Sequence, residues 1–254
     1  MTHELTLRLS LVLLSVSLLI QGFELYSLCG RIASNTPWSW AHVRRDFNHW
    51  PPAVLFILDR IYEVNFKYLI LLQLTLAFFL SVIPSFAVPA LTALYILIAL
   101  RFRGNFNGGS DSMSMMVLIS LNFALYNSTT NIGFHLVGFY CTVSYFIAGL
   151  VKLKNKYWRT GFALKVFLTQ SNYSIPEPIQ KWAHQRIFIL LSSTLVILFE
   201  CTFPIIWLLP GLTKLYVAGA LIFHIINYFC LGLNRFVFAW AATYPALFFC
   251  TLNT

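Results

Sequence analysis

The residue best placed to do chemistry in this sequence is a lysine at the end of an apolar stretch, SYFIAGLVKLKNKYW (144–158). If the stretch is helical, Tyr145, Gly149 and Lys152 share one face, at positions i, i+4 and i+7. Ala148 and Gly149 are small enough to let a second helix approach closely. Removal from water favours the neutral amine, so such a lysine can act as a base. The alternative is that Lys152 snorkels to the membrane surface.

The sequence also places a carboxylate inside an apolar segment. Glu200 lies near the centre of LVILFECTFPIIWLL, where an exposed carboxylate costs about 2.5 to 3.5 kcal/mol. We therefore expect Glu200 to be protonated, paired or turned toward a polar cavity. The candidate partners are a loop arginine, His224 and Lys152. Pro204, four residues further on, is expected to kink the helix and to open space beside Glu200.

A third polar group lies in the segment LYVAGALIFHIINYFCLGLNRF. His224 and Asn227 are three residues apart and therefore fall on the same side of a helix. They can form a structural hydrogen-bonding pair between helices, or orient a substrate or a quinone carbonyl. We expect no metal, because this helix face has no second histidine or carboxylate.

The segment RFRGNFNGGSDSM contains six residues that could act together: Arg101, Arg103, Gly108, Gly109, Ser110 and Asp111. The glycines free the backbone, and the serine or the aspartate can cap the following helix. A functional alternative is that free N–H groups at the helix start hold an anion or a polar headgroup with help from the arginines.

The elements that position these residues are membrane helices. The chain has 254 residues, of which 59% are hydrophobic and 10% charged, with a mean hydropathy of +0.75. We predict an all-α, polytopic transmembrane bundle that forms one domain over residues 1–254. About eight helices are expected, or seven if one segment is re-entrant: 7–28, 68–86, 88–100, 113–126, 133–153, 187–209, 214–233 and 236–251. The polar segments 30–67 and 154–186 are expected to lie at the lipid headgroups.

The positive charges fall mainly on one side of this topology. All of the 17 lysines and arginines except Arg8 and Lys214 follow odd-numbered helices or flank them. The positive-inside rule then places the basic loops in the cytoplasm and both termini outside. Topology accounts for the formal charge of +9, so the expected partner is the lipid bilayer and no nucleic acid is expected. Glu24, near the end of the first helix, is expected to be interfacial.

Four motifs occur in an order that resembles a known family: YFIAGLVKL (145–153), KYWRTGFAL (156–164), FECTFP (199–204) and FHIIN (223–227). Together they resemble the horizontally transferred transmembrane domain. This domain is the membrane portion of vitamin K-dependent gamma-carboxylases and of bacterial relatives such as sporulation-delaying toxin maturation proteins. The resemblance is strongest over residues 101–254.

The resemblance implies a helical bundle with its reactive centre near one membrane face. Lys152 occupies the position of the carboxylase lysine that deprotonates vitamin K hydroquinone, and His224 and Asn227 match residues that line that site. A quinone or a vitamin K-like hydroquinone is the cofactor that the resemblance suggests. Carboxylases carry an Asn-Asn-His motif where this chain has Asn107, Gly108 and Gly109, and their large extramembrane half has no counterpart here. We therefore expect the chain to be closer to the bacterial maturation proteins than to a true glutamate carboxylase.

Three functions remain open from the sequence. The first is a membrane-embedded enzyme that modifies or matures a peptide, with Lys152 as base and Tyr145, Glu200, His224 and Asn227 shaping the pocket. The second is a non-enzymatic subunit that works with other membrane proteins. The third is a transporter in which Glu200 and His224 form a proton path, although no inverted repeat is evident.

Overall fold

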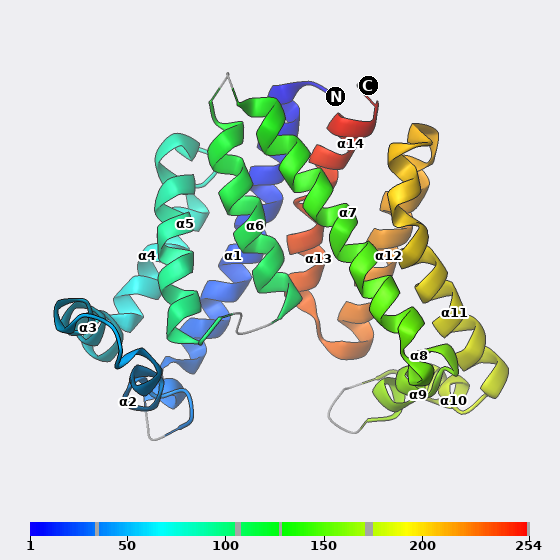
Figure 1. Cartoon of the computed structure of the whole chain (residues 1–254), viewed down its shortest axis with the longest axis horizontal. Coiled ribbons are helices and arrows are strands. Elements are labelled where there is room, and N and C mark those ends of the chain that lie inside the picture. The colour runs from blue at the N-terminus through cyan, green and yellow to red at the C-terminus, as the bar shows by residue number, and fades with distance from the viewer. Residues whose placement is uncertain (34–35, 105–107, 127–128, 171–174, 253–254) are drawn as a thin grey trace.

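The computed structural model describes all residues except 34–35, 105–107, 127–128, 171–174 and 253–254. Every regular element in the described part is helical, which confirms the all-α prediction. In Figure 1 the long helices run side by side, and both chain ends lie at the same end of the bundle. At the opposite end the short helices form two separate legs, one around α2 and α3 and one around α8 to α10.

The long elements and their bounds are α1 (His3–Ala33), α4 (Phe66–Phe78), α5 (Pro84–Arg101), α6 (Gly109–Ala124), α7 (Thr130–Lys154), α11 (Arg186–Thr202), α12 (Thr213–Leu231), α13 (Asn234–Ala241) and α14 (Tyr244–Leu252). Six described spans are long and apolar enough to cross a membrane, with α13 and α14 counted as one. The pair Pro52–Glu63 and Phe66–Phe78, bent by 75°, could add a seventh. The chain is therefore a multi-pass membrane protein.

The legs consist of short helices in the two segments expected at the headgroups. The first leg contains α2 (Trp40–Val43), η1 (Arg44–Phe47), α3 (Pro52–Asp59) and η2 (Arg60–Val64). The second contains α8 (Lys156–Arg159), α9 (Phe162–Thr169) and α10 (Glu177–Ala183). Two further 3-10 turns, η3 (Phe203–Trp207) and η4 (Pro210–Leu212), join α11 to α12.

One predicted boundary is wrong. The expected helices 68–86 and 88–100 are divided by the non-helical residues 79–83, and α5 begins at Pro84. Proline fits the first turn of a helix, where its missing N–H would have no partner, so Pro84 starts the helix. Pro89 is accommodated inside α5.

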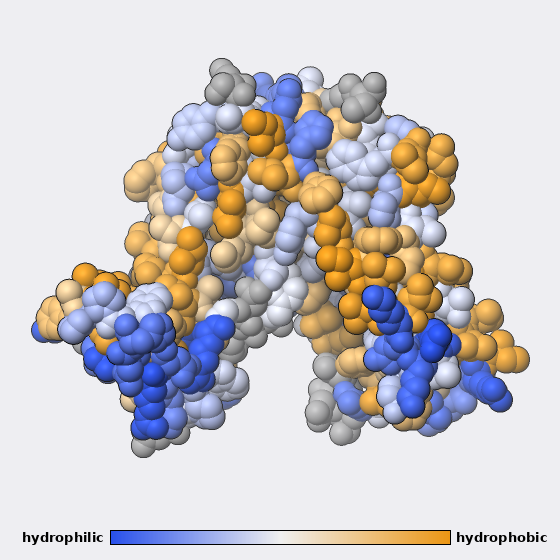
Figure 2. Space-filling view, in the orientation of Figure 1, coloured by the Kyte–Doolittle hydropathy of each residue, from blue (hydrophilic) through white to orange (hydrophobic). Residues whose placement is uncertain are grey.

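The surface of the bundle indicates contact with lipid. Figure 2 shows apolar side chains over much of the bundle face, whereas hydrophilic side chains gather on the two legs. Leu195 on α11 and Phe229 on α12 are 66% and 64% exposed. Large apolar patches of this kind are unfavourable in water and ordinary in a bilayer.

The hairpin of α6 and α7 depends on a close backbone contact at Gly133. A Cβ atom added there would lie 2.5 Å from the Ala124 nitrogen and 2.7 Å from the Ser120 oxygen. Such contacts are shorter than van der Waals separation, so only glycine allows the two helices to meet here.

We predict that Gly133→Ala lowers the free energy of unfolding in detergent by about 1 to 3 kcal/mol, because the added methyl group overpacks the hairpin. Gly211→Ala is the matched control, since a Cβ at Gly211 meets nothing within 4 Å. Thermal unfolding of the two variants measures the difference. Equal midpoints would show that the hairpin relaxes freely.

The charge rule gives a second prediction, on orientation. Asn131 and Lys154 lie at opposite ends of α7 and are both exposed. In a background without native cysteines, Asn131→Cys should react with a membrane-impermeant thiol reagent on intact cells, and Lys154→Cys only after permeabilisation. The reverse pattern would place the basic legs outside.

Candidate functional site

Lys152 does not snorkel to the surface but forms a buried ion pair. Its Nζ atom donates hydrogen bonds to Glu200 Oε1 at 2.8 Å and Oε2 at 2.7 Å. The side chains of Lys152 and Glu200 are 17% and 3% exposed. Lys152 Nζ also lies 5.3 Å from the centroid of the Trp158 ring. Of the three partners considered for Glu200, the structure selects Lys152.

The pair forms because α7 and α11 approach each other closely at Gly149. A Cβ atom added to Gly149 would lie 2.6 Å from the Cys201 nitrogen and 2.9 Å from the Glu200 carbonyl carbon. This contact places the last turn of α7 beside Glu200. Just beyond, α11 ends at Thr202, and the chain continues through Pro204 as the 3-10 turn η3. The expected kink at the proline is therefore an end of the α-helix.

The ion pair borders a cavity of about 660 Å³ between the second leg and helices α11 and α12. Lys152 and Asn227 contribute polar atoms to its wall, and most of the remaining lining is apolar, including Trp158, Phe167, Trp182, Phe188 and Phe223. The Asn227 amide forms no hydrogen bond within the described part of the chain. Cavities of this size and composition are typical of small-molecule sites.

The second leg is held over this cavity by local backbone features. The Asn155 side chain caps α8 by accepting a hydrogen bond from the Tyr157 N–H at 2.9 Å. Gly161 then adopts a left-handed conformation with φ +75°, and Ile189 of α11 packs against it. The Ser193 hydroxyl of α11 donates to the Trp158 carbonyl oxygen. These contacts fix the position of Trp158 above Lys152.

Tyr145 and His224 form a second polar group, deeper in the bundle. The Tyr145 hydroxyl lies 2.7 Å from His224 Nε2 and 3.2 Å from the Tyr244 hydroxyl. His224 Nδ1 is buried without a hydrogen-bond partner in the described part of the chain. An unpaired acceptor nitrogen costs less than an unpaired N–H, so we assign the proton to Nε2, which donates to Tyr145. His224 is thus held by a tyrosine and does not line the cavity, whereas Phe223, Ile226 and Asn227 of the FHIIN motif do.

The six residues of the 101–111 segment do not form one anion site. Gly108, with φ +56°, is the N-cap of α6 and has no side chain to offer, so neither Ser110 nor Asp111 occupies the capping position. Gly109 packs against Trp240, and Ser110 is buried. Arg103 pairs with Asp46 of the first leg, whereas Asp111 faces inward. Asn107 lies outside the described residues.

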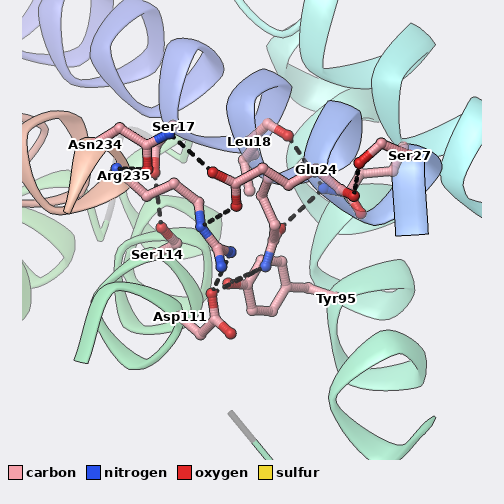
Figure 3. Close-up of polar contacts among 11 residues, drawn as sticks. Ser17, Leu18, Glu24, Ser27, Tyr95, Asp111, Ser114, Asn234 and Arg235 are labelled. Atoms are coloured by element: carbon pink, nitrogen blue, oxygen red, sulfur yellow. Dashed lines mark hydrogen bonds and ion pairs between the residues drawn. The ribbon is translucent and has the colours of Figure 1, made fainter. Parts of the chain in front are cut away.

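A buried ionic cluster that was not predicted from the sequence is drawn in Figure 3. Arg235 on α13 donates from Nε to Glu24 of α1 at 2.9 Å and from Nη1 to Asp111 of α6 at 2.8 Å. Asn234 donates to the other Glu24 oxygen at 2.8 Å. The Arg235 side chain is 3% exposed, so this arginine is part of the interior and not of a basic loop. Glu24, expected at the interface, is one of its two acidic partners.

Amide and hydroxyl groups extend this cluster across the bundle. Gln21 Nε2 lies 3.1 Å from Asp111 Oδ1 and 2.9 Å from the Tyr95 hydroxyl. Gln73 of α4 donates to Gln21 Oε1 at 2.9 Å. The sequence contained a signal for this network, since Gln21 and Gln73 both lie inside apolar spans. Buried amides are tolerated in a membrane only when they are hydrogen-bonded, so each glutamine required a polar partner.

Fold and site define the chain as a multi-pass α-helical membrane protein with two buried ion-pair centres. Among the described residues no group of three or more histidines, cysteines, aspartates or glutamates could hold a metal ion. No protein-family model, curated protein or solved structure matches the chain. Any narrower function must therefore be inferred from the site itself.

We predict that Lys152→Met lowers the free energy of unfolding by about 3 kcal/mol, because it leaves Glu200 buried without a cation. Lys152→Met combined with Glu200→Met should recover most of this loss, since two apolar side chains replace the pair. The control Lys154→Met, on the exposed end of α7, should change stability by less than about 0.5 kcal/mol. Unfolding in detergent micelles measures all three; additive effects of the two methionines would contradict the pairing.

Proposed function

We propose that this chain is a membrane-embedded enzyme that modifies or matures a peptide, with Lys152 as the base. The observation that carries the proposal is the ion pair of Lys152 and Glu200 at the wall of an apolar cavity, which is also lined by Asn227, whose amide has no hydrogen-bond partner among the described residues. A structural ion pair needs no such cavity. Buried titratable groups beside a largely apolar pocket are the usual signature of a reactive site.

The pair can remove a proton as one unit. For Lys152 to act as a base, its proton must first pass to Glu200, which leaves a neutral amine and a neutral carboxyl group. The amine then accepts a proton from an acidic group in the cavity. The products are a Lys152 ammonium, a protonated Glu200 and a substrate anion. The pair gains one positive charge, and this charge stabilises the new anion beside it.

The cavity is compatible with a quinone-like cofactor, as the resemblance to the carboxylase family suggests. Trp158, Trp182 and Phe188 offer flat apolar surfaces, and the Asn227 amide is a free hydrogen-bond donor for a ring oxygen. A vitamin K-like hydroquinone bound there would supply a weakly acidic hydroxyl group and a reducing ring. Residues Asn107, Gly108 and Gly109 replace the Asn-Asn-His motif of the carboxylases, so glutamate carboxylation is not part of the proposal.

The test compares the peptide products of cells that carry three versions of the protein. We expect Lys152→Arg to abolish the modification, because a guanidinium keeps the ion pair but does not release its proton near neutral pH. The control is Lys154→Arg, which should leave product masses unchanged. Mass spectrometry of small peptides from each strain gives the result. If membrane insertion is normal and the product masses are the same in all strains, the chain is a non-enzymatic subunit.

A further inference from the structure

Arg101, the last residue of α5, differs from every other arginine described above because it is buried without an acidic partner. Its side chain is about 2% exposed. One Nη1 hydrogen bond goes to the Trp38 carbonyl oxygen, and the guanidinium carbon lies 5.4 Å from the Phe66 ring centroid. The Nε atom is buried with no hydrogen-bond partner in the described part of the chain, and no carboxylate there pairs with Arg101.

A buried guanidinium without a counter-ion and with unsatisfied N–H donors destabilises the fold. It has five N–H donors, and an uncompensated buried charge costs several kcal/mol. The rings of Phe66 and Phe102 offset only part of that cost through cation–π attraction. Arg235, in the same bundle, is 3% exposed and binds two carboxylates. Arg101 is thus a cation whose counter-ion the described residues do not supply.

A pocket of about 370 Å³ lies against Arg101, between the end of α1 and the start of α4. Lys67, another lining residue, places its ammonium 5.1 Å from the centroid of the Tyr26 ring. Glu63 also lines the pocket, but it is exposed and pairs with neither cation. The lining thus combines one buried and one exposed cation with a single exposed carboxylate, and its net charge is positive.

The pocket also lies at the end of a membrane span, because Arg101 is the last residue of α5. It adjoins the first leg, on which Figure 2 shows concentrated hydrophilic side chains. Trp38, whose carbonyl oxygen binds Arg101, is itself about half exposed, as is typical of tryptophans at the membrane interface. Basic pockets between membrane helices near such an interface suit anionic lipid headgroups.

We propose that Arg101 and Lys67 bind a phosphate group, with Arg101 as the buried anchor and Lys67 at the entrance. A phosphate oxygen supplies an acceptor for the guanidinium N–H groups at the pocket, and its negative charge compensates that of Arg101. The source of the phosphate is either an anionic phospholipid of the surrounding leaflet or a soluble phosphate. This site is separate from the cavity beside Lys152, and it does not depend on the proposed enzymatic function.

The test measures thermal unfolding of the delipidated protein in a neutral detergent during titration with short-chain phosphatidylglycerol. Short-chain phosphatidylcholine and inorganic phosphate form two further arms, all at equal ionic strength. We expect phosphatidylglycerol to raise the midpoint of the unmodified protein saturably and phosphatidylcholine to do so more weakly. Stabilisation by phosphatidylglycerol alone assigns the site to a lipid, and equal stabilisation by inorganic phosphate assigns it to a soluble ligand.

Two matched variants locate the effect. Lys67→Gln should weaken the apparent affinity for phosphatidylglycerol about fivefold, the equivalent of one lysine near a charged headgroup. Lys156→Gln is the control, because Lys156 is also an exposed lysine 5.1 Å from a tyrosine ring but does not line this pocket. Arg101→Gln should abolish the response without lowering the midpoint in lipid-free detergent, since it removes an uncompensated charge.

Several outcomes would overturn the proposal. An equal response of Lys67→Gln and Lys156→Gln would show that lipid acts on the basic surface in general. The absence of any stabilisation by phosphatidylglycerol or phosphate would show that Arg101 needs no anion. If Arg101→Gln does not fold, the comparison of the two lysine variants still decides the question.

Discussion

The bundle depends on the rule that a charge inside a membrane must be compensated by an opposite charge close to it. Arg235 meets this rule by binding Glu24 and Asp111 at once, so that one guanidinium holds α13, α1 and α6 together. Removal of Arg235 would leave two carboxylates without a cation in a medium that solvates charge poorly. The same rule governs Lys152 and Glu200 between α7 and α11. The interior is therefore organised as much by electrostatic pairing as by apolar packing.

The Arg235 cluster and the pair of Lys152 and Glu200 have different surroundings. The Arg235 cluster is closed by amides and hydroxyls such as those of Gln21 and Tyr95, and an arginine keeps its proton under all ordinary conditions. Lys152 instead faces a cavity on one side and has an amine that can exchange a proton. This difference is the reason why the proposed function rests on Lys152 and Glu200 and not on Arg235.

Features that depend on local pattern, such as the membrane helices, could be predicted from the sequence. The ion-pair partners of buried charges could not. Long apolar runs predicted the membrane helices, and the cost of a central carboxylate predicted that Glu200 would face inward. Periodicity placed Gly149 and Lys152 on the face that contacts α11. It could not show that Arg235, far along the chain, reaches Glu24 and Asp111, because such pairing is fixed only by the tertiary arrangement. The ranges 68–86 and 88–100 likewise missed the start of α5, which lies at Pro84.

The close packing of α7 limits how this protein can change in evolution. On this helix Tyr145 contacts His224, Gly149 touches the backbone of α11, and Lys152 reaches Glu200. Each residue advances an α-helix by about 100°, so one inserted or deleted residue between positions 145 and 152 would turn one contact away from its partner. Variation in length among related chains should therefore be confined to the two legs and the connecting turns, while this stretch of α7 keeps a constant number of residues.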